Sequence, residues 1–144
     1  RSTVTFEAQA AIALETAAQR VRRADAPVYP MDLTELEGRL VLDPRPLICA
    51  AVKDRDAGTP LEIISAGIHE TIGRAAADAA ARIARERGIA TVALTGGVFQ
   101  NARLSEVTEA RLGVLGLEVL LHRQVPANDG GISVGQAAVG AAIL

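Results

Sequence analysis

The stretch Thr91-Val92-Ala93-Leu94-Thr95-Gly96-Gly97-Val98-Phe99-Gln100-Asn101 decides the fold of this 144-residue chain. It begins as a short apolar run typical of a strand, breaks at a pair of glycines and continues into residues with helical spacing. Because glycine lacks a Cβ atom, a ligand can approach the main chain closely at Gly96 and Gly97. The start of the next helix adds unpaired N–H groups and a partial positive charge. The pattern predicts a phosphate or nucleotide site, although a simple tight turn explains it equally well.

A second glycine loop follows the next strand of the chain. Residues 125–136 read Val-Pro-Ala-Asn-Asp-Gly-Gly-Ile-Ser-Val-Gly-Gln, and a helix, a stop at Gly116 and a strand over 117–121 separate the two loops. We therefore expect both loops at one edge of a sheet. In open α/β sheets, ligands bind outside the carboxyl ends of the strands.

Composition limits the classes of function. Apolar residues make up 49% of the chain and aromatic residues only 2%, so the core is built from Ala, Leu, Ile and Val. A net charge of −2 argues against a nucleic-acid-binding surface. The apolar runs are too short to cross a membrane. A single cysteine forms no internal disulfide, which fits a cytoplasmic protein.

The periodicity predicts one α/β domain over residues 1–144 with short connectors. We expect a hairpin of strands 31–35 and 39–42, strands 91–94 and 117–121, and helices over 6–23 (capped by Thr5), 44–56, 61–87, 101–115 and 132 to the end.

The long helix over 61–87 carries a regular apolar stripe. The predicted buried residues are Leu61, Ile64, Ile68, Ile72, Ala75, Ala79 and Ile83. Glu70–Arg74 and Asp78–Arg82 have the spacing of solvated ion pairs. His69 lies beside the stripe, and we interpret it as a partly buried structural histidine. Cys49, in the preceding helix, is interpreted as a small buried apolar residue.

Asp129 is the most informative acid, because the glycines after it bring the backbone in close and leave its carboxylate free to point into a cleft. A hard oxygen ligand at this point suits a divalent metal that bridges phosphate oxygens. Alternatively, Asp129 makes an Asx turn that caps the next helix. The residues alone favour the turn.

Two motifs together resemble a known family. Gly-Gly-Val-Phe-Gln-Asn at 96–101, followed by Pro-x-Asn-Asp-Gly-Gly-Ile-Ser-x-Gly-Gln-Ala at 126–137, is similar to the C-terminal end of the HypF hydrogenase maturation carbamoyltransferases. Residues 5–15 resemble the same family, except that Ala8 stands where a glycine is expected. The resemblance implies one half of a kinase/Hsp70/actin-like (ASKHA) nucleotide-binding fold, with a mixed sheet and packed helices. It also implies that the chain is the C-terminal subdomain of a Kae1-like domain.

The resemblance implies a chemistry as well. Such proteins convert carbamoyl phosphate and ATP into carbamoyl adenylate and pass the carbamoyl group to a C-terminal cysteine of a HypE-type maturation protein. It assigns nucleotide binding to Gly96, Gly97, Val98, Asn101, Gly130 and Gly131. It assigns a divalent metal (Fe, Zn or Mg) to Asp129, but the histidine pair and the adenylating domain of the family are absent from this sequence. No catalytic residue is expected within the chain.

Two alternatives stay open. The chain is an isolated nucleotide-binding or packing module without turnover, for which a homodimer is possible, or it belongs to the sugar O-carbamoyltransferases of the same fold. Phe99-Gln100 in the first glycine motif and Asp129-Gly130-Gly131-Ile132 in the second favour the hydrogenase maturation proteins over the sugar O-carbamoyltransferases.

Overall fold

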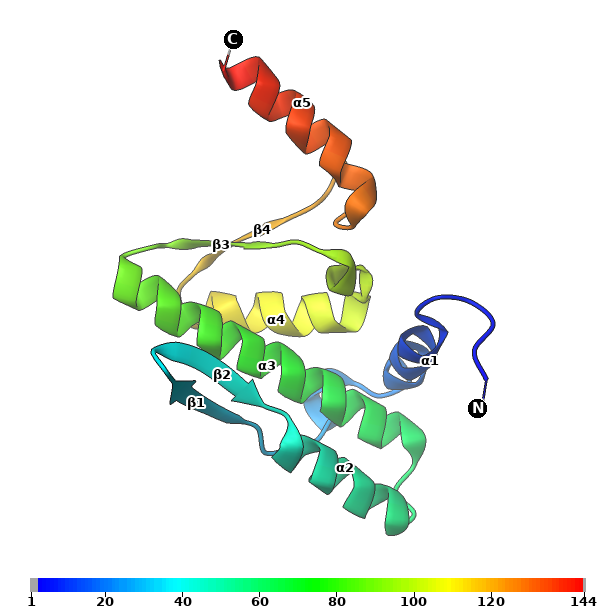
Figure 1. Ribbon diagram of the computed structural model, residues 1–144. Helices are drawn as coiled ribbons and strands as arrows, with labels where there is room; N and C mark the ends of the chain where they lie inside the picture. Colours follow the sequence, from blue (N-terminus) through cyan, green and yellow to red (C-terminus); the bar gives the residue numbers. More distant parts are fainter. Residues whose placement is uncertain (1–2, 144) are drawn as a thin grey trace.

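The computed structural model describes residues 3–143, so residues 1–2 and 144 of the predicted domain lie outside it. Helix α3 crosses the middle of the molecule, with α4 and α1 against it and a β-hairpin and α2 on its other side (Figure 1). The elements are, in chain order, α1 (Gln9–Ala18), η1 (Arg23–Asp25), β1 (Asp32–Leu36), β2 (Arg39–Asp43), α2 (Arg45–Asp56), α3 (Leu61–Arg87), β3 (Thr91–Leu94), η2 (Gly97–Gln100), α4 (Ala102–Val114), β4 (Glu118–Leu121), η3 (Asp129–Gly131) and α5 (Ile132–Ile143).

The described strands form two separate two-stranded sheets. Strands β3 and β4 are parallel, in a register that pairs Thr91 with Glu118 and Leu94 with Leu121, and α4 is the crossover between them. This confirms that the two glycine loops follow neighbouring strands. The antiparallel hairpin β1–β2 is confirmed too, and its turn residues Glu37 and Gly38 have φ angles of 51° and 74°, as a type I′ turn requires.

Small side chains bring the central helices close together. Ala77, Leu94 and Leu112 form one buried cluster, which joins α3 and α4 to the parallel sheet. A Cβ atom added at Gly73 of α3 would lie 2.6 Å from Cγ1 of Val107 in α4. The close approach of α3 and α4 therefore depends on a residue without a side chain.

The predicted buried stripe of α3 is wrong in part, because Ile64 is buried as predicted but three of the other large apolar residues are not. Leu61, Ile72 and Ile83 are exposed, by 61%, 38% and 42%, whereas the buried residues of α3 other than Ile64 are small or polar. Close helix packing selects side-chain size, so the bulky apolar residues lie at the margin of the contact. The predicted pairing of Asp78 with Arg82 is also wrong, because Asp78 accepts a hydrogen bond from Arg111 on α4.

Glu70 is not solvated, contrary to the expected ion pair at the surface. Its side chain is 1% exposed, and its carboxylate lies between the guanidinium groups of Arg74 at 2.8 Å and Arg23 at 3.5 Å. A buried carboxylate requires such partners, because transfer of an isolated charge out of water is very unfavourable.

Helix α1 is shorter than predicted, because the chain turns sharply before it. Ala8 has the left-handed conformation, with φ of 60°, and the helix begins only at Gln9. Thr5 is not the cap: its backbone N–H donates to the Gln9 side chain. Phe6 stays 53% exposed. The left-handed backbone at Ala8 gives a physical reason for a glycine at this position.

Helix α2 packs on the body through Leu47, its one buried residue, and Cys49 is exposed, so its interpretation as a buried residue is wrong. The segment before the hairpin ties α2 to α3. Tyr29 donates from its hydroxyl to Asp54 of α2 and from its backbone N–H to Thr71 of α3, both over 2.7 Å. Burial, helped by the bond to Asp54, raises the pKa of Tyr29 to about 12.

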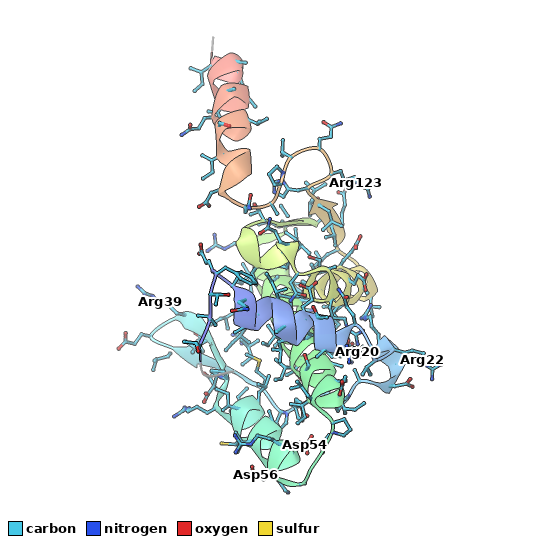
Figure 2. The ribbon with its side chains drawn as sticks, turned by 90° about the vertical axis from the view of Figure 1, so that its right-hand side faces the viewer. Arg20, Arg22, Arg39, Asp54, Asp56 and Arg123 are labelled. Carbon is cyan, nitrogen blue, oxygen red and sulfur yellow. The ribbon has the colours of Figure 1, made fainter. Side chains whose placement is uncertain are left out.

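Helix α5 stands clear of the other helices (Figure 1), and it contains no buried and no charged residue. Charged side chains such as Arg20, Arg39, Asp56 and Arg123 lie around the outside of the rest of the molecule (Figure 2). Between residues 3 and 143, the chain has no helix that combines the length and the apolar character needed to cross a membrane.

Candidate nucleotide site at the glycine loops

The glycine loops border two hollows. The first, which we call the α1 hollow, has a volume of about 430 Å³ and lies between α1 and the loop after β3. Its walls include Ala8, Ala11 and Ile12 on one side and Gly97 and Val98 on the other. The second, the β4 hollow, has a volume of about 290 Å³ and lies between the ends of β3 and β4. It is lined by Gly96, His122, Asp129 and Gly131, among others.

The two loops contact each other directly. The N–H of Gly96 donates to the carbonyl of Ala127 over 2.8 Å. A Cβ atom at Gly97 would lie 3.9 Å from that of Asn128, and His122 Nε2 lies 3.0 Å from the Thr95 hydroxyl. Gly96 has a φ of 96°, which favours glycine there. The structure thus brings Gly96 and Gly97 together with the loop that contains Asp129, Gly130 and Gly131.

Both polar atoms of the Asn101 side chain have hydrogen-bond partners at the start of α4. Its Oδ1 accepts from the N–H of Leu104 over 2.9 Å, and its Nδ2 donates to Nε2 of His69 over 2.9 Å. The Nδ1–H of His69 in turn donates to the Ser65 carbonyl over 2.8 Å, which fixes the neutral tautomer. His69 is 5% exposed. It is confirmed as a structural histidine, and it orients a residue that lines the α1 hollow.

Two of the N–H groups at the start of α4 are not open to a phosphate, although unpaired N–H groups are expected there. The N–H of Ala102 donates to Oε1 of Glu15 over 2.7 Å, and the N–H of Leu104 donates to Asn101. Glu15 lies on α1, far from Ala102 in sequence, so the local sequence does not predict this hydrogen bond. Gly97 and Val98 are candidates for ligand contact, because they begin the short helix η2 and its first N–H groups have no partner within it.

The second loop uses its glycines for its own packing. The N–H groups of Gly130 and Gly131 donate to the side chain and the carbonyl of Asn128, over 3.1 Å and 3.0 Å. A Cβ atom at Gly131 would lie 2.6 Å from the carbonyl oxygen of Pro126. Because the loop itself explains both glycines, their assignment to nucleotide binding stays a prediction.

Asp129 is exposed at the β4 hollow. Its interpretation as the turn residue is wrong, since Asn128 makes the Asx turn. Asp129 is therefore available as a ligand. However, residues 3–143 contain no group of three or more His, Cys, Asp or Glu side chains that could hold a metal ion. The described residues do not make a complete metal site, and Asp129 supplies one carboxylate at most.

The fold and the paired loops define a class of protein. A parallel β3–α4–β4 unit with glycine loops at its carboxyl edge is part of one half of a kinase/Hsp70/actin-like nucleotide-binding fold. Residues 1–136 match the family described as the carbamoyltransferase, Kae1-like domain, second subdomain. The chain therefore belongs to the HypF carbamoyltransferase family.

Relatives and solved structures agree with this placement. The carbamoyltransferase HypF of Synechocystis sp. is 40% identical over 133 residues, which cover 92% of this chain and 16% of the relative. That of Rhodobacter capsulatus is 36% identical over 97% of this chain and 17% of the relative. A full-length HypF crystallised in a phosphate- and nucleotide-bound form is 37% identical, with a TM-score of 0.88 over all of this chain and 18% of that chain. The HypF of T. kodakarensis has a TM-score of 0.77 at 27% identity, over 95% of this chain and 17% of that one. The chain thus spans about a sixth of the length of these proteins.

Proposed function

We propose that residues 1–144 form the C-terminal, nucleotide-binding subdomain of a carbamoyltransferase domain in a larger protein. In that protein, ATP or carbamoyl adenylate binds beside Gly96–Asn101. The carbamoyl group passes to the C-terminal cysteine of a HypE-type partner. The observation that carries this proposal is the contact between the two glycine loops, where Gly96 donates to Ala127 at the carboxyl edge of β3 and β4. The similarity to a HypF crystallised with nucleotide supports it.

In this reaction the chain positions the nucleotide and does not supply a side chain that reacts. In acyl transfer from an adenylate, the thiol of the acceptor attacks the carbamoyl carbon and AMP leaves. This step needs correct placement and stabilisation of charge more than a nucleophile of the enzyme. Cys49 does not compete for this role, because it lies on α2, across α3 from the glycine loops (Figure 1). Asp129 serves as one ligand of a divalent metal whose other ligands come from outside this chain.

A second candidate function is a nucleotide-binding or packing module without turnover. The exposed helix α5 favours it, because large apolar side chains without cover are typical of surfaces that meet another polypeptide. Membership in the HypF family favours the hydrogenase branch over the sugar O-carbamoyltransferases.

Nucleotide titration followed by backbone amide NMR tests the proposal. We expect AMP and ATP to shift the signals of Gly97 and Val98, with weak affinity, because only part of the binding cleft is present. Gly97→Ala should weaken binding, since a methyl group hinders close approach to the main chain. Gly113→Ala, on α4 with open space around it, is the matched control. Shifts confined to another surface, with Gly96 and Gly97 unchanged, would contradict the proposal.

A further inference from the structure

The α1 hollow has an unusual combination of walls. Ala8, Ala11 and Ile12 give it an apolar side, and Glu15 is the one charged residue among those that line it. Glu15 uses Oε1 to accept the N–H of Ala102, which fixes the carboxylate at the start of α4. Within residues 3–143, no other hydrogen bond to this carboxylate is formed, so Oε2 keeps its capacity to accept.

A fixed carboxylate decides which part of a nucleotide suits this hollow. It compensates the partial positive charge at the start of α4 and repels a phosphate that approaches the same place. It accepts hydrogen bonds from hydroxyl groups, as acidic residues do from ribose hydroxyls in dinucleotide-binding folds. An apolar wall suits a base, and a volume of about 430 Å³ lies in the range of small-molecule sites.

We propose that the α1 hollow binds the nucleoside part of the nucleotide, and that Glu15 recognises the ribose diol. The base lies against Ala8, Ala11 and Ile12, and the phosphates leave the hollow past Gly97 and Val98. His69 is a positioning residue that does not contact the nucleoside itself. It holds the Asn101 side chain and thereby the start of α4. This inference rests on the proposed nucleotide site and adds a specificity determinant that the glycine motifs do not contain.

The opposing explanation is that Glu15 only ties α1 to α4. If Glu15 only links α1 to α4, its loss should lower the affinity of every ligand of the hollow equally. If Glu15 contacts the diol, its loss should lower the affinity only of ligands that have a ribose diol. The test therefore compares adenosine with 2′,3′-dideoxyadenosine, by amide NMR titration of the chain at Gly97 and Val98.

We expect the wild-type chain to bind adenosine about 10-fold more tightly than the dideoxy compound, the size expected for a hydrogen bond to a charged group. Glu15→Gln retains an oxygen for Ala102 but loses the charge, and it should lose most of this discrimination. Glu15→Ala should abolish it. Glu7→Gln, a change of an exposed acid that does not line the hollow, should keep the full ratio.

Three results would overturn the inference. Equal affinity of the wild-type chain for adenosine and the dideoxy compound would contradict the role of Glu15. An unchanged affinity ratio in folded Glu15→Gln would contradict it too. Neither result would contradict the proposed nucleotide site. Absence of shifts at Gly97 and Val98 with every nucleoside and nucleotide removes the proposed site itself, and the inference with it.

Discussion

Asp129 and Asn128 are neighbours with separate tasks. Asn128 shapes the loop, since its side chain accepts the N–H of Gly130 and its carbonyl accepts that of Gly131. The side chain of Asp129 makes no hydrogen bond in the described part of the chain and stays exposed at the β4 hollow, while its carbonyl accepts the N–H of Ile132. The turn and the proposed metal contact therefore depend on different residues, and single substitutions can test them separately.

In the protein that contains this subdomain, Asp129→Asn should lower metal content and carbamoyl transfer while thermal stability without metal stays near wild type. Asparagine nearly conserves volume but removes the negative charge that a hard metal prefers. Elemental analysis and thermal unfolding measure the two effects. Asn128→Ala is the matched control, and it should cost about 0.5–2 kcal/mol of stability through loss of the turn. Full metal occupancy in Asp129→Asn would end the assignment.

Contacts between residues distant in sequence account for what the sequence did not predict about the site. The glycine pairs and their strands were predictable, because turn residues and short apolar runs are local signals. The carboxylate of Glu15 at the start of α4 was not, since a hydrogen bond between residues 87 apart leaves no trace in periodicity. His69 was interpreted as a structural histidine, but its contact with Asn101 was not predicted for the same reason, since the two residues lie in different elements.

At the scale of elements, the central helix pair depends on small residues. Local periodicity predicted the existence and type of the α-helices and strands, including the end of the long helix at residue 87, after which Gly88 has a φ of 65°. It misassigned part of the buried face of α3, although Ile64 is buried as predicted, because periodicity ranks residues by apolarity, whereas this contact selects them by size. Gly73 illustrates the point, since the Val107 side chain occupies the place of its missing Cβ.

Gly73→Ala should destabilise the protein by about 1–3 kcal/mol, although alanine is the better helix former, because the added methyl group forces α3 and α4 apart. Gly113→Ala, also within a helix but facing open space, should stabilise it by about 0.5–1 kcal/mol. Chemical denaturation of both variants measures the difference. Equal effects of the two substitutions would show that α3 and α4 do not pack as closely as described.

At the scale of the whole molecule, α5 has no covering layer, and the parallel sheet is covered by α3 and α4 but leaves Leu120 52% exposed. Large apolar side chains on α5, such as Val139 and Ile143, are 60% and 79% exposed. The chain also spans about a sixth of its relatives and has no group of three metal-binding side chains within residues 3–143. Each of these features agrees with a subdomain that completes its site with other polypeptide.

The purified 144-residue chain should therefore show no carbamoyl transfer from carbamoyl phosphate and ATP to a partner thiol. Mass spectrometry of the acceptor peptide is the measurement, with the complete protein as the positive control. Carbamoylated peptide formed by the chain alone, at a rate above the uncatalysed background, would contradict this expectation and show that the described residues suffice for turnover.

The bond between Glu15 and Ala102 also bears on the order in which the site forms during folding. Strands β3 and β4 meet across 27 residues, and the α4 crossover brings them together locally. The α1 hollow closes only when residues 87 apart in the chain meet. Loop-closure entropy disfavours the longer connection, and contacts of long sequence separation slow folding. We therefore expect the parallel unit to shape the glycine loops first and the α1 hollow to form later, when α1 docks.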